Sequence, residues 1–373
     1  MKTRVLMLFG GRSGEHEISI RSASNVAESL DSDKFELVPI AISTDGEWLD
    51  PRASAGLLSE NARSVLAADP GEIGDIRYEI VAGRPIDRDR EIVVFPVLHG
   101  PFGEDGTVQG MLELAQVPYV GCGVLASACG MDKIVMKSLF DQAGLPICRY
   151  TWLLRSDWEE RRGEFVDQIA NHLGFPCFVK PANLGSSVGI SKAVDADSLA
   201  DAIELAAQFD RRIVVEEGLN AREIECAIIG NSKAEASLPG EYVIKDRSKT
   251  FLDYEEKYAG TGNNEFVVPS PVSDELADKI RKMAVSAFKA IDGSGLARVD
   301  FFLRQDTGAL LINEINTMPG LTDASGFPKM WSGSGIPFPV ILERLIELAK
   351  ERFNDKNRNR VTRSENIVLK GGA

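Results

Sequence analysis

One stretch of the sequence, ARVDFFLRQDTGALLINEIN, places charged and amide side chains at regular intervals on two short apolar runs. The runs are rich in β-forming residues and flank Asp-Thr-Gly, a pattern that predicts an antiparallel hairpin. With the turn centred on that threonine, Asp300 lies opposite Glu314 and Arg298 lies opposite Asn316. Because side chains alternate along a strand, all four are expected on one face of the hairpin.

This face of the hairpin predicts a metal site. Two carboxylates directly opposite each other, with Cβ atoms about 5 Å apart, repel unless a cation lies between them. Asp300, Glu314 and the amide oxygen of Asn316 are hard ligands of the kind that hold Mg²⁺ beside a nucleotide. The alternative is a solvated polar face on which Arg298 pairs with either acid. A bulge in either strand would change the register.

A second segment, Lys180–Gly189 (KPANLGSSVG), follows a predicted buried strand. Its glycines allow backbone N–H groups to approach phosphate oxygens, and Ser186 and Ser187 add hydroxyl donors. Lys180 places a positive charge at the end of the strand. The alternative is a plain hairpin turn. The predicted metal site elsewhere in the chain favours a nucleotide phosphate site here.

Three other motifs are interpreted as unrelated to catalysis. GSSVG within this loop has the GxSxG form of a serine hydrolase, whose histidine follows the serine in the chain. The three histidines here all precede it: His16, His99 and His172. Gly121, Gly123 and Ala126 fit a weak dinucleotide motif and are interpreted as a tight turn between domains. No GxxxxGK[ST] segment occurs, which excludes a P-loop enzyme.

The elements that position these segments follow from hydrophobic patterns. Strands are predicted at 4–9, 35–42 and 91–98, with a helix at 17–30, and this alternation indicates a parallel α/β domain. Residues 52–90 give no clear pattern. Later strands are predicted at 175–182 and 212–217, and helices at 132–143, 195–209, 274–291 (with Ser273 as its N-cap) and 338–353. The expected domains are residues 1–130, 131–218 and 219–353, followed by a polar tail at 354–373.

Composition narrows the class of protein. The net charge of −14 disfavours a nucleic-acid partner. Five cysteines, an odd number without CxxC spacing, predict free thiols in a reducing compartment. The chain shows no segment of membrane-spanning length, so we expect a cytoplasmic protein without a membrane partner.

Taken together, the motifs resemble those of the D-alanine–D-alanine ligase family. The run HGPFGEDGTVQG and residues 296–320 match its two signatures. Four shorter segments match in the same order: Gly10–Glu17, Met131–Lys133, Lys180–Gly189 and Glu256–Tyr258. The resemblance covers roughly residues 3–350. It implies a three-domain ATP-grasp fold with an N-terminal Rossmann-like sheet, followed by a small ATP-grasp subdomain and a C-terminal ATP-grasp and metal-binding domain.

The resemblance also implies an activity. ATP and two D-alanines would give D-alanyl-D-alanine, ADP and phosphate through an acyl phosphate, for cell-wall precursors, with two Mg²⁺ or Mn²⁺ ions. The implied assembly is a homodimer. Residues 246–264, polar and glycine-bearing, are expected to form a lid that excludes water. The base that takes the proton of the attacking amine is not identified; Tyr258 and a substrate phosphate oxygen are both candidates.

Site roles transfer position by position from the resemblance. The implied ATP ligands are Lys133, Phe178, Lys180, Ser186, Ser187, Glu216, Glu217, Leu219, Glu223, Phe251 and Lys257. The implied catalytic groups are Glu15, Ser186, Tyr258, Arg298 and the Gly320 N–H. The implied substrate ligands are Glu15, His99, Arg298 and Ser325. The implied metal ligands are Asp300, Glu314 and Asn316.

One position departs from the family pattern. Gly326 stands where relatives carry a larger side chain near the second substrate, and this is expected to widen the acceptor pocket. D-Alanyl-D-serine ligase is therefore the first alternative. D-Alanyl-D-lactate ligase is less favoured, because Tyr258 is typical of enzymes with an amine acceptor. A non-catalytic ATP-binding regulator on the same scaffold is a third.

Overall fold

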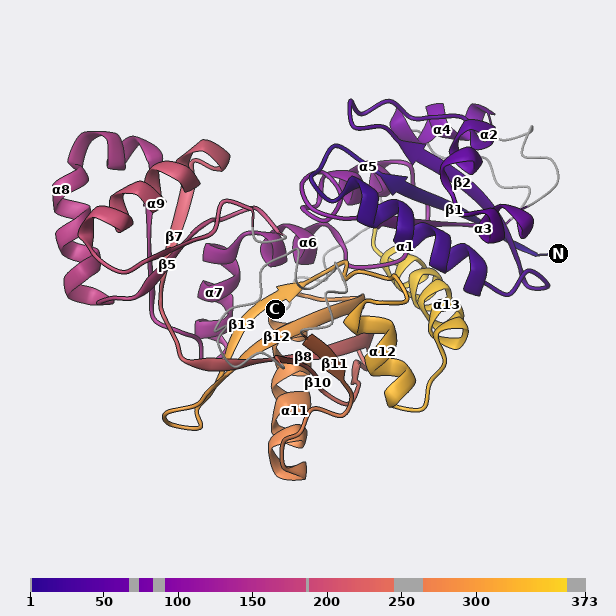
Figure 1. Ribbon diagram of the computed structural model, residues 1–373. Coiled ribbons are helices and arrows are strands. Elements are labelled where there is room, and N and C mark those ends of the chain that lie inside the picture. Colours follow the sequence, from indigo (N-terminus) through magenta and orange to yellow (C-terminus); the bar gives the residue numbers. More distant parts are fainter. Residues whose placement is uncertain (1, 67–73, 83–90, 186–187, 245–263, 361–373) are drawn as a thin grey trace, which may run out of the picture.

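Three β-sheets organise the molecule (Figure 1). The computed structural model describes residues 2–66, 74–82, 91–185, 188–244 and 264–360. A parallel sheet at the N-terminus is followed by a four-stranded and a six-stranded antiparallel sheet. The α/β class with an N-terminal parallel sheet is as predicted from the sequence.

The first sheet has the strand order β2-β1-β3, with β1 at Thr3–Gly10, β2 at Phe35–Ile42 and β3 at Ile92–Leu98. Nearly every residue of the three strands is buried, as expected of a parallel sheet covered on both faces. Helix α1 (His16–Ser29) follows β1, and α5 (Thr107–Leu114) follows β3. The bounds of β1, β2, β3 and α1 confirm the predicted elements to within one residue, whereas α5 was not predicted.

In the region that the sequence pattern left unassigned, the described residues up to 66 and at 74–82 form three short helices. They are α2 (Pro51–Leu57), α3 (Glu60–Ser64) and α4 (Gly74–Val81). The first two have readable N-caps, because Asp50 accepts from two backbone N–H groups of α2 and Ser59 accepts from one of α3. Both helices have fewer than eight residues, too few for a helical hydrophobic period to show.

The four-stranded sheet has the order β4-β7-β5-β6. Its strands are β4 (Tyr150–Leu154), β5 (Cys177–Pro181), β6 (Ser191–Ala193) and β7 (Arg212–Glu217). Helices α8 (Arg155–His172) and α9 (Ala196–Phe209) pack on it, with Trp158, Leu199 and Ile203 in the shared core. Since β5 and β6 pair, the glycine-rich loop joins two antiparallel strands. The loop is thus a hairpin connection in topology, as the alternative interpretation expected, and this topology does not by itself test a nucleotide role.

The six-stranded sheet has the order β11-β10-β8-β12-β13, with β9 paired to β8. Its strands are β8 (Ala221–Gly230), β9 (Glu235–Ala236), β10 (Gly240–Ile244), β11 (Asn264–Val267), β12 (Gly295–Arg304) and β13 (Leu310–Asn316). The surrounding helices are α6 (Val124–Met131), α7 (Lys133–Gln142), α11 (Asp274–Ala290), α12 (Gly326–Gly333) and α13 (Phe338–Lys356). Ser273 caps α11 as predicted, and α13 extends to Lys356, beyond its predicted end at 353.

The hairpin of β12 and β13 has the predicted register at its four candidate site residues. Asp300 faces Glu314, and Arg298 faces Asn316. On its other edge β12 pairs with β8, where Asp300 lies opposite Glu225. Three acidic residues therefore form a row across three neighbouring strands.

A β-bulge interrupts the same hairpin immediately after the acidic row. Phe301 pairs with Ile312, so Asn313 is an extra residue on β13. The register predicted from the turn is therefore wrong between the bulge and the turn. The bulge brings Asn313 to the same pocket as Glu314.

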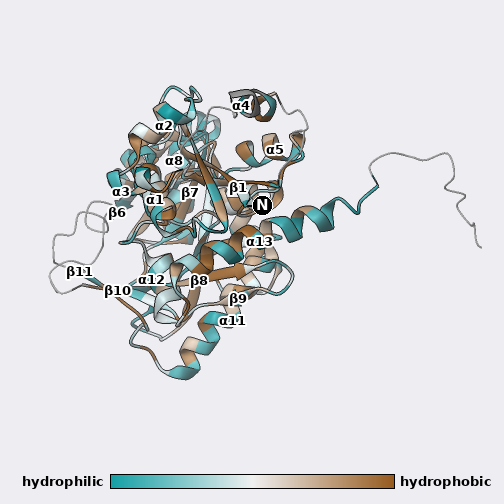
Figure 2. Ribbon diagram, turned by 90° about the vertical axis from the view of Figure 1, so that its right-hand side faces the viewer, coloured by the Kyte–Doolittle hydropathy of each residue, from teal (hydrophilic) through white to brown (hydrophobic). Residues whose placement is uncertain are grey.

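The apolar cores do not follow the sheets one to one. One core joins the parallel sheet to α12, α13 and parts of β8 and β12, through residues such as Phe9, Phe95, Leu296, Trp331 and Leu345. The four-stranded sheet has a core of its own. Figure 2 shows apolar β8 in the interior and a hydrophilic C-terminal part of α13.

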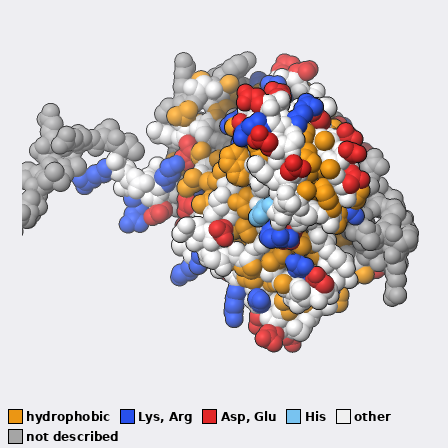
Figure 3. Space-filling model, turned by 90° about the vertical axis from the view of Figure 1, so that its left-hand side faces the viewer, with side chains coloured by type: hydrophobic (Ala, Val, Ile, Leu, Met, Phe, Trp, Pro, Cys, Tyr) orange, Lys and Arg blue, Asp and Glu red, His pale blue; other side chains and the backbone are white. Residues whose placement is uncertain are grey.

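The surface agrees with the composition. On the face shown in Figure 3, acidic and basic side chains are interspersed, with apolar side chains exposed between them. Across the described ranges, no helix is long and apolar enough to cross a membrane. The five cysteines, all within described ranges, are free thiols.

Candidate active site

A cavity of about 200 Å³ lies where the three sheets meet. It is lined by most of the predicted site residues: Glu15, His99, Lys133, Phe178, Lys180, Glu216, Glu217, Leu219, Glu223, Arg298, Asp300, Glu314, Asn316 and Gly320. These residues come from segments as far apart in the chain as α1 and β13. The fold therefore brings together side chains that the sequence analysis could connect only by resemblance.

Of the predicted site residues that the structure describes, Ser325 alone does not line the cavity. Ser325 is buried behind Gly320, where a Cβ on that glycine would lie 2.8 Å from the Ser325 hydroxyl oxygen. That hydroxyl lies 2.7 Å from the Thr322 hydroxyl, so Ser325 supports the segment after Gly320. Five further predicted residues lie outside the described residues: Ser186, Ser187, Phe251, Lys257 and Tyr258. The expected lid at 246–264 also falls almost entirely outside them.

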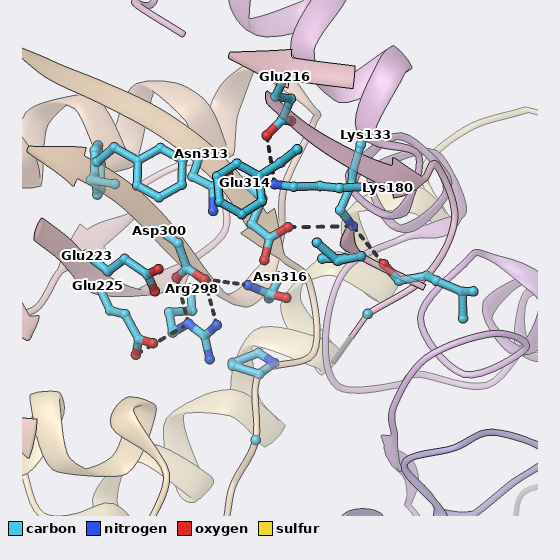
Figure 4. A pocket seen from close by; sticks show the side chains of 18 of the residues that line it. Lys133, Lys180, Glu216, Glu223, Glu225, Arg298, Asp300, Asn313, Glu314 and Asn316 are labelled. Carbon is cyan, nitrogen blue, oxygen red and sulfur yellow. Dashed lines mark hydrogen bonds and ion pairs between the residues drawn. The ribbon is translucent and has the colours of Figure 1, made fainter. Parts of the chain in front are cut away.

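The polar end of the hairpin forms one wall of the cavity (Figure 4). Arg298 donates to both carboxylate oxygens of Asp300, at 2.7 and 2.6 Å. Asn316 Nδ2 donates to the same carboxylate at 3.1 Å. The ion pair of the alternative interpretation is thus present, on a largely buried wall and not on a solvated face.

Glu314 faces the lysines of the opposite wall. Lys133 Nζ lies 3.5 Å from a Glu314 carboxylate oxygen and donates to the Leu184 carbonyl at 2.7 Å. Burial raises the pKa of Glu314, but the charges of Lys133 and Lys180 outweigh burial and bring it below its usual value. Glu314 is therefore ionised at neutral pH. Lys133 therefore links Glu314 of the hairpin to the loop that begins at Lys180.

A buried charge cluster of Lys180, Glu216 and Lys137 forms part of the cavity wall and continues behind it. Lys180 Nζ is 2.7 Å from one oxygen of Glu216, and Lys137 Nζ is 2.9 Å from the other. Burial would raise the pKa of Glu216, yet the two ammonium groups outweigh it and lower the pKa to about 2. Lys137 is fully buried and also donates to the Asn313 carbonyl at 3.4 Å.

Sequence reasoning missed Lys137. Its only signal was its spacing, since it lies four residues after Lys133 on the predicted helix and so on the same helical face. Asp132 caps that helix by accepting from the N–H groups of Ile134 and Val135. The cap fixes the start of α7 and thereby both lysines.

A second missed residue, Glu104, belongs to the segment after β3. Its carboxyl group accepts from the Gly100 N–H at 2.7 Å and lines the cavity near Glu15. Burial, reinforced by the negative charge of Glu15, raises the pKa of Glu104 to about 8. Glu104 is thus mostly neutral at pH 7, so it does not repel a second carboxylate in the cavity.

His99 is held from both ring nitrogens. Nδ1 lies 3.0 Å from the Met318 carbonyl, which can only accept, so Nδ1 carries the proton. Nε2 lies 3.3 Å from the Ser22 hydroxyl. Burial lowers the pKa of His99, which agrees with a neutral ring. The imidazole thereby ties the end of β3 to the segment that follows β13.

Gly326 does not open the pocket as expected. It is buried at the first position of α12, where a Cβ would lie 2.4 Å from a Glu225 carboxylate oxygen and 2.9 Å from Phe266 Cζ. The space that a side chain would take is therefore filled. The expectation of a widened acceptor pocket is wrong for this physical reason.

The hairpin set does not form a cluster of acids. Within the described ranges, no group of three or more His, Cys, Asp or Glu side chains is arranged to hold a metal ion. The predicted set contains two carboxylates and one amide, and Glu225, the third acid of the row, is turned toward Arg298.

Comparisons with known proteins agree with this site. Residues 4–122 match the family described as D-ala D-ala ligase N-terminus, and residues 139–347 match D-ala D-ala ligase C-terminus. The D-alanine–D-alanine ligase of Heliobacterium modesticaldum is 45% identical over 97% of this chain and 99% of its own length. That of Geobacillus thermodenitrificans is 47% identical over 95% and 98%.

Solved structures show the same fold. The D-alanine–D-alanine ligase from Coxiella burnetii has a TM-score of 0.77 at 33% identity and covers 96% of each chain. The VanG D-Ala:D-Ser ligase from Enterococcus faecalis has a TM-score of 0.77 at 34% identity, covering 94% of this chain and 100% of its own. The two family matches and the full-length relatives leave one assignment: this chain belongs to the D-alanine–D-alanine ligase family.

Proposed function

We propose that this chain is an ATP-dependent ligase that joins two D-alanines through an acyl phosphate, giving D-alanyl-D-alanine, ADP and phosphate. The carrying observation is the cavity in which Arg298, the facing pair Asp300 and Glu314, and the lysines Lys133 and Lys180 converge. Family membership supports the same activity.

ATP is proposed to lie along the part of the cavity wall that carries Lys133 and Lys180. Lys133 and Lys180 supply positive charge for phosphate oxygens, with Lys257, Ser186 and Ser187 added from the sequence prediction. Glu216, Glu217, Leu219 and Glu223 line the part of the cavity proposed for the adenosine. Phe178 lines the same wall, and Phe251 is predicted to join it.

The residues of the hairpin fit a pair of Mg²⁺ ions, or Mn²⁺. Asp300 and Glu314 offer hard carboxylate oxygens, and the Asn316 amide offers an oxygen if it rotates from its present hydrogen bond. When bound, such ions neutralise phosphate charge during transfer. Asp300 must release at least part of its pair with Arg298 to take this role.

The protein's own groups are proposed to bind the substrates and stabilise the intermediates by their position and charge. A carboxylate has a poor leaving group, and phosphorylation makes it an acyl donor. Arg298 and the Gly320 N–H are proposed to stabilise the oxyanion of the tetrahedral intermediate. Glu15 is proposed to hold the ammonium group of the first D-alanine and His99 its carboxyl group. Ser325 is predicted from the resemblance to hold the second carboxylate, which requires its hydroxyl to turn from Thr322 toward the cavity. Ser186 and Tyr258 are proposed to complete the loop over the site.

The wider setting follows from the family. We propose that the product enters cell-wall precursor synthesis in the cytoplasm and that the enzyme acts as a homodimer. D-Alanyl-D-serine synthesis is the second candidate, and the similarity to a solved D-Ala:D-Ser ligase favours it over the others.

The test is phosphate release from ATP and Mg²⁺ with D-alanine alone, then with D-alanine plus D-serine or D-lactate, with products identified by mass. We expect phosphate and D-alanyl-D-alanine in equal amounts with D-alanine alone. Turnover that requires D-serine or D-lactate would reassign the acceptor. ATP binding without turnover in any mixture would support a regulator and contradict the ligase.

A further inference from the structure

Glu225 is a buried acid in the cavity wall that the sequence analysis did not single out. It lies on β8 directly across from Asp300 and is 6% exposed. Asp300 in turn faces Glu314, so Glu225 is one end of the acidic row. The carboxylate of Glu225 turns toward Arg298 (Figure 4), with Oε2 3.4 Å from Arg298 Nε.

Arg298 therefore lies between the carboxylates of Asp300 and Glu225. Of the two, only Asp300 is a proposed metal ligand. The contacts of Arg298 with Asp300 are short and bidentate, at 2.7 and 2.6 Å. Under the proposed function, Asp300 must turn to a metal ion and loosen this pair. Glu225 is not one of the proposed metal ligands, and its Oε2 lies 3.4 Å from Arg298 Nε, so it can stay beside the guanidinium.

The lack of a side chain at Gly326 leaves room for the Glu225 carboxylate. A Cβ at position 326 would lie 2.4 Å from Glu225 Oε2, closer than any side-chain carbon can approach. The carboxylate thus occupies the volume that a side chain on α12 would fill. The lack of a side chain at Gly326 and the position of Glu225 are therefore one structural feature.

We propose that Glu225, accommodated by the missing side chain at Gly326, is a positioning residue that holds Arg298 toward the reacting carboxyl group once Asp300 is engaged by metal. This inference rests on the proposed function. It assigns to β8 and α12 the role of keeping the oxyanion-stabilising guanidinium in place while the hairpin acid changes partner.

The first experiment is a double-mutant cycle in the full-length enzyme with Mg²⁺, ATP and D-alanine. Glu225→Gln keeps the shape and removes the charge, and a lost charge-assisted contact corresponds to roughly a tenfold to hundredfold lower kcat. We expect KM for ATP to change by less than about twofold, because the residues proposed to bind ATP lie on a different part of the cavity wall. In an Arg298→Lys background, Glu225→Gln is expected to add less than about threefold, because both act through one contact.

Two glycine variants test the structural basis. Gly326→Ala pushes on Glu225 and on Phe266, and we expect it to reproduce the kcat loss of Glu225→Gln. Gly333→Ala, on the same helix α12, is the matched control, since its Cβ would lie 2.5 Å from Val268 Cγ1 and meets only Val268 atoms among its three nearest neighbours. We expect Gly333→Ala to lower the thermal midpoint but keep kcat within about twofold.

A readout that needs no turnover is Mn²⁺ binding, followed by the electron paramagnetic resonance signal of the free ion. Without Glu225 to receive it, Arg298 competes more strongly for Asp300, so Glu225→Gln is expected to weaken Mn²⁺ binding about threefold or more. Glu223→Gln removes an equal charge two residues away on β8 and measures the purely electrostatic part. Equal weakening in both variants would contradict the proposal.

The outcomes separate this inference from the function on which it rests. Wild-type enzyme that makes D-alanyl-D-alanine, with Glu225→Gln at full kcat, overturns the role of Glu225 alone. Fully additive losses in the Arg298→Lys background overturn it as well. Wild-type enzyme that makes no dipeptide overturns the proposed function, and the Mn²⁺ titration then still decides whether Glu225 and Asp300 compete for Arg298.

Discussion

At the scale of single residues, the site is a set of charges that satisfy one another before any ligand arrives. Asp300 is bound by Arg298, Glu314 lies near Lys133, and Glu216 is enclosed by Lys137 and Lys180. The alternation rule predicted which side chains of the hairpin share a face. It could not predict Lys137 or Glu225, because a buried ion pair depends on which other element packs against it.

Arg298 gives the first residue-scale prediction. Arg298→Lys keeps the charge but loses the planar fork that meets two partners at once. We expect kcat to fall about a hundredfold to a thousandfold, as when an oxyanion donor is removed, with KM for ATP little changed. Steady-state kinetics with saturating Mg²⁺ measures this. A large rise in KM for ATP with normal kcat would place Arg298 in nucleotide binding instead.

Glu216 gives a pH prediction with a definite sign. Burial raises the pKa of Glu216, but Lys137 and Lys180 bring it down to about 2, from an ordinary 4.5. A carboxyl group with a lowered pKa stabilises the fold above its unfolded pKa and loses this as pH falls through its folded pKa. Between pH 5 and 2.5, wild type is therefore expected to lose about 2 kcal/mol relative to Glu216→Gln.

Urea unfolding of wild type and Glu216→Gln over that pH range measures the difference in free energy of unfolding. Lys192→Met, which removes an exposed lysine on the neighbouring β6, serves as the control and is expected to track wild type. Parallel curves for wild type and Glu216→Gln would show that the charge cluster does not favour ionised Glu216.

At the scale of elements, sequence patterns were strongest for strands with a continuous apolar run, such as β1, and for helices with one long apolar face, such as α11. Such strands and helices, including β1, β7, α9 and α11, were predicted to within one or two residues. Helix α8 was missed because it buries only Trp158 and Ile169 in 18 residues. The bulge at Asn313 was foreseen as a risk but not located, since it depends on packing and not on a turn signal.

The cap of α7 gives an element-scale prediction. Asp132 accepts from two N–H groups at the start of this helix and pairs with Arg212. Asp132→Ala is expected to cost about 1–2 kcal/mol of stability and to raise KM for ATP, because Lys133 and Lys137 lose their fixed start. Thermal unfolding and ATP kinetics measure the two effects.

The matched control is Asp195→Ala at the N-cap of α9. Asp195 accepts from the Ser198 N–H, and α9 contributes no residue to the cavity. We expect a similar loss of stability with unchanged KM for ATP. Equal changes of KM in both variants would mean that α7 does not position the lysines specifically.

At the scale of the whole molecule, the cores suggest which parts move as units. We propose a domain division near residues 131 and 219, as the sequence analysis expects. The parallel sheet shares one apolar core with α12, α13 and part of the six-stranded sheet, whereas the four-stranded sheet is built around its own. Composition and periodicity could not reveal this, because they do not show which apolar faces meet.

This arrangement predicts how the molecule unfolds. A unit with a separate core opens with its own free energy, so the four-stranded unit is expected to unfold before the rest in the absence of ligand. The cavity walls belong to both units, since Lys180 lies in one and Asp300 in the other. A ligand that bridges them stabilises only the joined state, by about 2.7 kcal/mol at a hundred times its Kd.

Calorimetry is therefore expected to show two transitions without ligand and one, at higher temperature, with a non-hydrolysable ATP analogue and Mg²⁺. A single transition in both conditions would show that α7 and the connecting segments already join the two cores into one cooperative unit.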